Sequence, residues 1–372
     1  VYEYEQSGAS YGQTSSDLHL KRIQYVDHET GHSGQNFLVS IDFELQDRPD
    51  PFSTYRPGFE IRTWKRCSRI AIHTHPNRQT KLLKNYDLIY LDQRSDLEDL
   101  TDQLPLNRSS LLNQVVVKGH DGMETEALPP LQFAYSTFQP CERDFFPVKG
   151  DALPARSLRR PELELADLTG NGLPDIVELS GVPRSWINLG QGRFDRPHTM
   201  DRAPAGLSVT DPGVQLLDAN GDGRLNLMTC ENGVCGYFAL SFDGQWSKDS
   251  FHKYPAAPSL DFQDSNLRLV DLDGDGVTDA LRSGSRFECF FNDPDKGWAE
   301  TRRVKRQNRE SFPDVMFSDP RVHWADMSGD GLQDIVLIHD NHIVYWPNLG
   351  HGDWGRRVNM ERSPRLPFEY DP

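Results

Sequence analysis

The sequence has few of the features that mark membrane-spanning or disulfide-built proteins. No apolar run approaches the roughly 20 residues that a membrane-spanning helix needs, and no charged-then-apolar leader opens the chain. The five cysteines are odd in number and include no CxxC pair, which argues against a disulfide framework and a zinc site. Cys230 and Cys235 flank a predicted hairpin turn, where we expect two thiols rather than a bridge. We expect a soluble region excised from something longer.

Positive charge is also scarce. Lys and Arg number 40 against 56 Asp and Glu, a net charge of −16. Nucleic acid and anionic lipid repel such a surface, so we expect no nucleic-acid partner and no direct membrane insertion. One basic run is predicted to be a solvated edge strand or loop, with a binding patch as the alternative. Its members are Arg302, Arg303, Lys305, Arg306 and Arg309.

The common catalytic motifs are missing as well. The sequence contains no glycine-rich phosphate loop, no GxSxG and no HExxH. His73 and His75 alternate on one predicted strand, where a hydrogen-bonded or exposed pair is favoured over a ligand set. No two acidic residues stand out as a glycosidase pair. We therefore predict that the chain is not an enzyme and has no catalytic residue.

What the sequence does contain is a repeat. The stretches DLTGNGLPD, DANGDGRLN, DLDGDGVTD and DMSGDGLQD start at residues 167, 218, 271 and 326, so they are 51, 53 and 55 residues apart. This period indicates stacked or radially arranged units. Trp186, Trp346 and Trp354 recur at fixed repeat positions, so we predict that they belong to the packing core of the blades rather than bind sugars.

Each repeat is predicted to form four short strands. Apolar residues alternate or run in fours to sixes between Gly, Asn and Asp, and no helical spacing persists. Four-stranded units of this length are typical of β-propeller blades. We predict an all-β fold with one propeller domain of six blades: about two irregular blades in 1–150 and four regular blades in 151–372. Five or seven blades, or a solenoid, are the alternatives.

The acidic turns predict either calcium binding or tight turns capped by their own side chains. In DxDGDGxxD the carboxylates at positions 1, 3, 5 and 9 can converge, and Ca²⁺ takes six to eight oxygen ligands. Asp and Asn can instead accept hydrogen bonds from their own backbone. An EF-hand is excluded because three of the four copies lack Glu at position 12. The third turn offers the best ligand set. The candidates are Asp271, Asp273, Asp275, Asp279, Asp326, Asp330, Asp334, Asp167, Asn171, Asp175, Asp218, Asn220 and Asp222.

Longer stretches carry a family resemblance. PDPFSTYRPGFEIRTWKRCSRI at 49–70, LPPLQFAYSTF and the stretch at 312–358 resemble the B component (TcB) of Tc insecticidal toxin complexes. The acidic turns resemble the calcium loops of FG-GAP and VCBS propeller repeats. The resemblance implies that the B and C components form a hollow cocoon around a toxic enzyme. It also implies a six-bladed propeller that docks onto the pore-forming A component and closes the exit of the cocoon.

The resemblance therefore implies a secreted docking and gating module. Its partners would be the A component, the remainder of the B component and the C component. It requires no cofactor, calcium being the one candidate, and the sequence identifies no partner-binding residues. We expect residues 1–150 and the linker at 139–155 to be the less stable part. The alternative function is an adhesin-like or lectin-like propeller that binds glycans or a host receptor.

Overall fold

A computed structural model gives the fold of the chain. It describes residues 1–7, 17–27, 37–97, 104–105, 107–122, 124–136, 144–231, 233–256, 260–304, 312–361 and 363–365. The chain divides into two compact units. The first comprises Val1–Thr54 and Glu60–Asp144, and the second comprises Tyr55–Phe59 and Phe145–Pro372. Within the described residues, no helix is long and apolar enough to cross a membrane.

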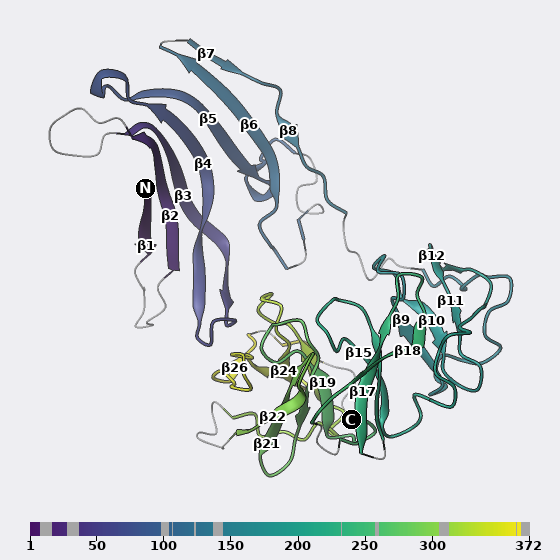
Figure 1. Cartoon of the computed structure of the whole chain (residues 1–372). Helices are drawn as coiled ribbons and strands as arrows, with labels where there is room; N and C mark the ends of the chain where they lie inside the picture. Colours follow the sequence, from purple (N-terminus) through teal and green to yellow (C-terminus); the bar gives the residue numbers. More distant parts are fainter. Residues whose placement is uncertain are drawn as a thin grey trace. The chain divides into compact units, whose positions relative to one another are not determined.

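The first unit is one antiparallel sheet of eight strands (Figure 1). The strands run in the order β1 to β7, and β8 pairs with β6. Short 3-10 turns follow β4 and β5. The elements are β1 (Tyr2–Ser7), β2 (Asp17–Asp27), β3 (Phe37–Thr54), β4 (Ile61–Thr74), η1 (Pro76–Arg78), β5 (Lys81–Tyr90), η2 (Leu91–Gln93), β6 (Leu112–Asp121), β7 (Glu124–Ala127) and β8 (Leu131–Gln132).

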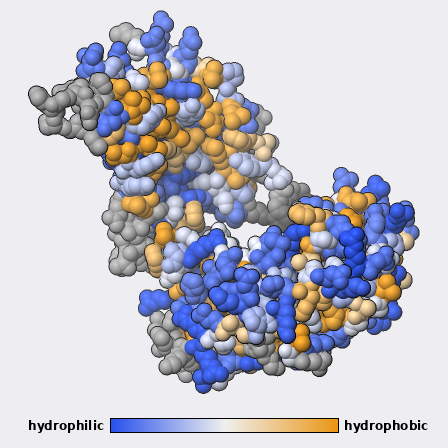
Figure 2. Space-filling model, viewed as in Figure 1, coloured by the Kyte–Doolittle hydropathy of each residue, from blue (hydrophilic) through white to orange (hydrophobic). Residues whose placement is uncertain are grey.

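The two faces of this sheet differ in polarity because side chains alternate along each strand. Ile41 lies opposite Ile23 and Ile72, whereas the next residue, Asp42, lies opposite Arg22. Figure 2 shows apolar residues gathered over the first unit on the face in view. Few described side chains of this unit are fully buried. They are Ser40, Arg66, Ala71, Asn85 and Leu91.

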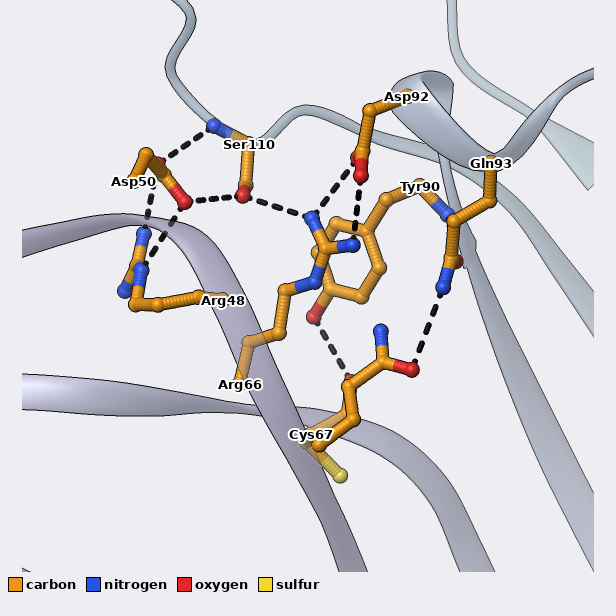
Figure 3. Close-up of polar contacts among 9 residues, drawn as sticks. Arg48, Asp50, Arg66, Cys67, Tyr90, Asp92, Gln93 and Ser110 are labelled. Atoms are coloured by element: carbon orange, nitrogen blue, oxygen red, sulfur yellow. Dashed lines mark hydrogen bonds and ion pairs between the residues drawn. The ribbon is translucent and has the colours of Figure 1, made fainter.

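A buried arginine joins the long strands to the loops beside them (Figure 3). Arg66 on β4 is 8% exposed. Its guanidinium donates two parallel hydrogen bonds to the carboxylate of Asp92 in η2, at 2.8 and 2.7 Å. It also donates to the Ser110 hydroxyl at 2.7 Å, and it lies over the Tyr90 ring, 4.1 Å from the centroid. A bidentate pair of this kind fixes both partners in direction as well as distance.

The same network reaches β3 through Asp50. The Asp50 carboxylate accepts hydrogen bonds from the Ser110 hydroxyl and from the Ser110 amide, the latter at 2.7 Å. Arg48 donates to both of its oxygens, at 3.1 and 3.0 Å. Burial alone would raise the pKa of Asp50, but the hydrogen bonds from Arg48 and Ser110 outweigh it and hold the pKa well below its usual range. The network therefore ties β3, β4, η2 and the segment before β6 together.

The second unit consists of four antiparallel sheets of four strands each, in a β-propeller arrangement. We number these sheets as blades 1 to 4. Blade 1 contains β9 (Leu163–Ala166), β10 (Asp175–Glu178), β11 (Arg184–Trp186) and β14 (His198–Thr199); blade 2 contains β15 (Val214–Leu217), β16 (Asn226–Glu231), β17 (Val234–Leu240) and β18 (Trp246–Lys253); blade 3 contains β19 (Leu267–Val270), β20 (Asp279–Arg282), β21 (Phe287–Asp293) and β22 (Gly297–Val304); blade 4 contains β23 (Val322–Ala325), β24 (Asp334–His339), β25 (His342–Trp346) and β26 (Val358–Asn359). A two-stranded ribbon, β12 (Asn188–Gly190) with β13 (Arg193–Phe194), accompanies blade 1.

Apolar cores lie between consecutive blades. Leu168 of the first acidic turn and Trp246 of blade 2 share one cluster. Met228 of blade 2 and Phe290 of blade 3 share the next, and Phe287 of blade 3 packs with blade 4 in the third. Trp346 and Trp354 are buried in the third cluster, whereas Trp186 is buried within blade 1. Trp186 is 2%, Trp346 5% and Trp354 6% exposed, so the prediction that they are packing residues is confirmed.

The prediction of six blades is wrong. Among the described residues four blades form, all in the second unit, and the first unit contains one further sheet. The two irregular blades predicted in 1–150 are instead part of an eight-stranded sheet whose strands β3 and β4 have 18 and 14 residues. Alternating apolar residues indicate a strand but do not say how many strands share a sheet. The boundary lies after Asp144 rather than at 150.

The cysteine prediction also needs a correction. Cys230 and Cys235 form a disulfide across the hairpin of β16 and β17, where they are directly opposed with their Cα atoms 4.0 Å apart. Cys67 and Cys289 are free, and Cys141 lies outside the described residues. The sequence placed the two cysteines at a turn, but their pairing depends on strand register, which the turn residues alone do not fix.

The arginine network predicts an unequal response of two neighbouring residues on β4. Arg66→Met would remove the bidentate pair with Asp92 and the bond to Ser110, and a hydrogen bond to a charged group contributes about 1.5 to 3 kcal/mol. Lys65→Met removes only an exposed ion pair with Asp47, which is worth at most about 1 kcal/mol. Hydrogen exchange of β3 and β4 peptides in the whole chain should show much faster opening for Arg66→Met alone. Equal protection in the two variants would contradict a structural role for the network.

Candidate functional site

The four acidic turns connect the first and second strands of the four blades. In each turn the aspartate at position 1 accepts hydrogen bonds from the backbone of the turn itself. The Asp167 carboxylate accepts from the amides of Thr169, Gly170, Asn171 and Gly172 at 2.7 to 3.2 Å. Burial alone would raise the pKa of Asp167, but these amides outweigh it and lower the pKa. Asp218, Asp271 and Asp326 cap their turns in the same way.

Glycine is required in these turns because the backbone enters the left-handed region. In the third turn Gly274 has a φ of +80° and Gly276 a φ of +89°. Side chains other than glycine rarely adopt these angles without strain. The two glycines let the amides point inward to the Asp271 carboxylate. The spacing of Asp and Gly is therefore explained by the conformation of the turn, without any bound ligand.

The aspartate at position 9 has a different, buried role. Asp279 is 2% exposed, and its carboxylate accepts from the Leu272 amide at 3.0 Å and from the Asn292 amide at 2.7 Å. It therefore fastens the acidic turn to the end of the third strand of the blade. Burial raises the pKa of Asp279 to about 8, against an ordinary value of 3.8.

The same connection recurs in two other blades. Asp175 accepts from the amides of Leu168 and Asn188, and Asp334 accepts from those of Met327 and Asn348. Burial raises the pKa of Asp334 to about 6 and raises that of Asp175 as well. In blade 2 position 9 is Asn226, whose Oδ1 accepts only from the Ala219 amide.

The third turn alone brings three carboxylates together among the described residues. Ligand oxygens of Asp271, Asp273 and Asp275 lie within 4.8 Å of one another. Burial, and then the charges of Asp273 and Asp271, raises the pKa of Asp275. A hard divalent cation would relieve this repulsion, and carboxylate oxygens suit Ca²⁺. Asp279 does not belong to this group, so the predicted set of four carboxylates is reduced to three.

The remaining candidate ligands serve their own turns. Asn171 accepts from the Leu173 amide and Asp222 from the Arg224 amide, while the Asn220 side chain donates to Asp222. Asp330 accepts from the Leu332 amide through one oxygen. The capped-turn interpretation therefore describes most of the candidates, and the metal interpretation applies to the third turn.

Two further predictions concern residues outside the turns. His73 Nδ1 lies 2.9 Å from an Asp42 oxygen, and His75 Nε2 lies 3.0 Å from the Ser40 hydroxyl, so the favoured hydrogen-bonded pair is confirmed. In the basic run, Arg302 and Arg303 lie on β22, the edge strand of blade 3. They pair with Asp353 and Glu288, at 2.8 and 3.2 Å. Lys305, Arg306 and Arg309 lie outside the described residues, as do residues 139–143 of the predicted linker.

Sequence reasoning missed the partner of the third and fourth turns, the segment Tyr55–Phe59. This segment groups with the second unit. The Tyr55 amide donates to the second oxygen of Asp330 at 2.6 Å, and Arg56 donates to the Gly274 carbonyl at 2.5 Å. The residues lie inside the stretch at 49–70 that carries the family resemblance. The pattern of that stretch does not reveal a contact more than 200 residues away along the chain.

Comparisons with known proteins agree with the sequence resemblance. The pattern of the family described as Salmonella virulence plasmid 65kDa B protein (SpvB) matches residues 10–75. Among solved structures, the Tc holotoxin pore of Photorhabdus luminescens contains a chain 23% identical over all of this chain, with a TM-score of 0.67. The sequence resemblance to Tc toxins therefore extends to a fold shared with a chain of the Tc holotoxin. Because the identity is low, the structural match shows a shared fold.

Two other solved structures match the chain with lower TM-scores. The TcdB2-TccC3 crystal structure matches 99% of the chain at 19% identity, with a TM-score of 0.40. An Agrocybe aegerita lectin that recognises non-reducing terminal N-acetylglucosamine matches 67% of this chain and 61% of its own at 17% identity, with a TM-score of 0.39. Scores this low carry no argument. The chain spans 19% of the holotoxin chain and 22% of the TcdB2-TccC3 chain. The search of curated proteins finds no match.

The raised pKa of Asp279 predicts a pH dependence of stability. Between pH of about 4 and about 8 the carboxyl is neutral in the folded chain and ionised in the unfolded chain. The unfolded state then binds fewer protons, so this stabilising contribution is complete below pH 4 and is lost as the pH rises through 8. Asp279→Asn should make the urea midpoint fall less steeply over this range, although the lost acceptor lowers it at every pH.

Blade 2 offers the reverse substitution as a matched control. Asn226→Asp adds a carboxyl at the equivalent buried position, with one amide donor rather than two. The fall of the urea midpoint between pH 4 and 8 should therefore become steeper in this variant. Parallel curves for wild type and both variants would show that the buried carboxyls do not titrate in this range.

Proposed function

We propose that this chain is a docking and gating region of a secreted Tc toxin B component. In this proposal the blades bind the pore-forming A component, and the chain works together with the remainder of the B component and the C component. The observation that carries the proposal is the fold shared with the Tc holotoxin over the whole length of the chain. In this role the chain binds other toxin components and controls the exit from the cocoon, and it catalyses no reaction.

The construction of the first unit supports this proposal. An eight-stranded sheet with few buried side chains and one largely apolar face lacks a core of its own among the described residues. Large exposed apolar side chains on such a sheet mark a surface that other parts of an assembly cover. Exposed examples include Tyr2, Tyr4, Leu18 and Leu83. A wall of the B and C component cocoon would supply that cover.

The end of the blades that carries the acidic turns has the features of a docking surface. Phe242 in the turn between β17 and β18 is 98% exposed, and Leu189 near the first acidic turn is 58% exposed. The β17–β18 turn lies at this end, since a Cβ placed on Gly244 would be 3.4 Å from the Leu168 carbonyl. Exposed aromatic side chains surrounded by polar groups are typical of binding hot spots.

The repeated tryptophans weigh against the lectin-like alternative. Sugar-binding tryptophans present a ring face to solvent, whereas Trp186, Trp346 and Trp354 are buried between or within blades. The acidic turns are also largely occupied by their own backbone amides. Glycan binding therefore has no support from the residues that first suggested it.

A pair of substitutions tests both the docking function and the end of the blades that docks. Phe242→Glu alters the end with the acidic turns, and Val234→Glu alters the opposite end, where exposed Val234 is the first residue of β17. In a B component assembled with its C component, we expect Phe242→Glu to weaken binding of the A component about tenfold or more. Val234→Glu should leave this affinity unchanged. Biolayer interferometry with the immobilised A component measures the affinity of both variants.

The other outcomes are equally informative. A loss confined to Val234→Glu would place docking at the opposite end of the blades. Failure of the unmodified assembly to bind any A component, with retention on a glycan array, would remove the proposed function altogether.

We also propose calcium as a ligand of the third acidic turn. Three carboxylates converge there, and no other described turn shows such a group. A ligand that binds only the folded state raises the unfolding midpoint as its concentration passes the dissociation constant. The thermal midpoint should therefore rise in millimolar calcium and return in chelator, and Asp273→Asn should abolish this response. Asp222→Asn in the second turn is the matched control, and a response that survives Asp273→Asn would exclude the third turn.

A further inference from the structure

A basic segment of the chain itself lies on the third and fourth acidic turns. Arg56 Nη2 donates to the Gly274 carbonyl at 2.5 Å, and the neighbouring Tyr55 amide donates to Asp330 at 2.6 Å. A Cβ placed on Gly350, in the turn after β25, would lie 3.8 Å from the Arg56 carbonyl. The segment therefore contacts two acidic turns and one neighbouring turn at the same time.

The guanidinium occupies the space between the glycines of two turns. A Cβ placed on Gly274 would lie 3.0 Å from Arg56 Nε and 3.1 Å from Nη2, and one placed on Gly331 would lie 3.9 Å from Nη1. Leu332 of the fourth turn approaches the same Gly274 position at 3.2 Å. A side chain at residue 274 would require the arginine to shift by a few tenths of an ångström, and its backbone would be strained at a φ of +80°. The third turn therefore contacts the Arg56 guanidinium in addition to the hydrogen bonds within its own backbone.

The position of Arg56 matters because the third turn carries the one group of three carboxylates among the described residues. Asp271, Asp273 and Asp275 converge within one turn, and Gly274, whose carbonyl accepts from Arg56, lies between the last two. A second basic side chain, His351, is 3.7 Å from Asp273. A divalent cation bound by these carboxylates would share the turn with the guanidinium that Gly274 holds.

We propose that Arg56 is the built-in cation of the third acidic turn, and that Arg56 and a divalent cation bind this turn in competition. With Arg56 in place, the guanidinium balances part of the carboxylate charge and holds the segment Tyr55–Phe59 on the turns. A divalent cation that binds the three carboxylates repels the guanidinium and releases the segment. The inference rests on the calcium proposal for the competing ligand, but it assigns the resting occupant to the chain itself.

Calcium binding by the whole chain, measured by titration calorimetry, tests the competition. Arg56→Ala should bind calcium about tenfold more tightly than wild type, because a positive charge held on the same turn as the divalent ion is removed. Arg202→Ala is the matched control, since Arg202 is also an exposed arginine of the second unit but pairs with Asp243. Adding Asp273→Asn to Arg56→Ala should abolish the gain.

A second measurement follows the segment directly. Hydrogen exchange of peptides covering Tyr55–Phe59 in wild type should become faster when calcium is added, because the Tyr55 amide loses its bond to Asp330. The same peptides in Arg56→Ala should exchange fast with or without calcium. Retained thermal stability of Arg56→Ala would show that the variant is folded.

The outcomes separate this inference from the proposals before it. Equal calcium affinities in wild type and Arg56→Ala overturn the competition, even if calcium raises the unfolding midpoint. Absence of binding in both overturns it too. Tight binding in Arg56→Ala with no midpoint response in wild type supports the competition and contradicts a calcium-loaded native state. Docking of the A component is measured separately through Phe242, so it does not depend on any of these results.

Discussion

The blades depend on a buried aspartate that accepts two backbone amides. Asp175, Asp279 and Asp334 each accept one amide from their own acidic turn. Each accepts a second amide from a residue at the end of the third strand of the blade or shortly after it. Burying a carboxyl is costly unless its oxygens are satisfied, and here two amides that would otherwise be unpaired satisfy them. The connection allows a four-stranded blade to have a defined end, against which the apolar core of the next blade packs.

This arrangement explains why a motif that looks like a metal loop is mainly structural. Position 1 accepts backbone amides in all four turns, and an aspartate at position 9 accepts two amides in three of them. Among the described residues, the third turn alone also brings the carboxylates of positions 1, 3 and 5 together. There the chain supplies Arg56 as a neighbouring cation. The first unit follows a different principle, in which the bidentate pair of Arg66 and Asp92 ties a thin sheet together where apolar burial is small.

The local features of the chain could be predicted from its sequence, and the longer-range ones could not. The period near fifty and the Asp and Gly spacing predicted four blades and their turns, and the fixed tryptophans were correctly predicted as core. The strands of residues 1–150 were recognisable, and each of β1 to β6 pairs with the next strand along the chain. Local patterns do not say whether such consecutive strands continue as one sheet or divide into separate blades, so the single sheet was not predicted. The contact of Arg56 with Gly274 and the pairing of Cys230 with Cys235 depend on tertiary register, which no local pattern encodes.

Blade 2 differs from the others in a way that has a consequence for its surroundings. It has Asn226 where the other blades have the buried aspartate, and it is the blade whose central hairpin carries the Cys230–Cys235 bridge. The disulfide thus lies in the blade whose position-9 side chain accepts the fewest backbone amides. In a thiol-rich compartment the disulfide would be reduced, and blade 2 would then be the first blade to unfold.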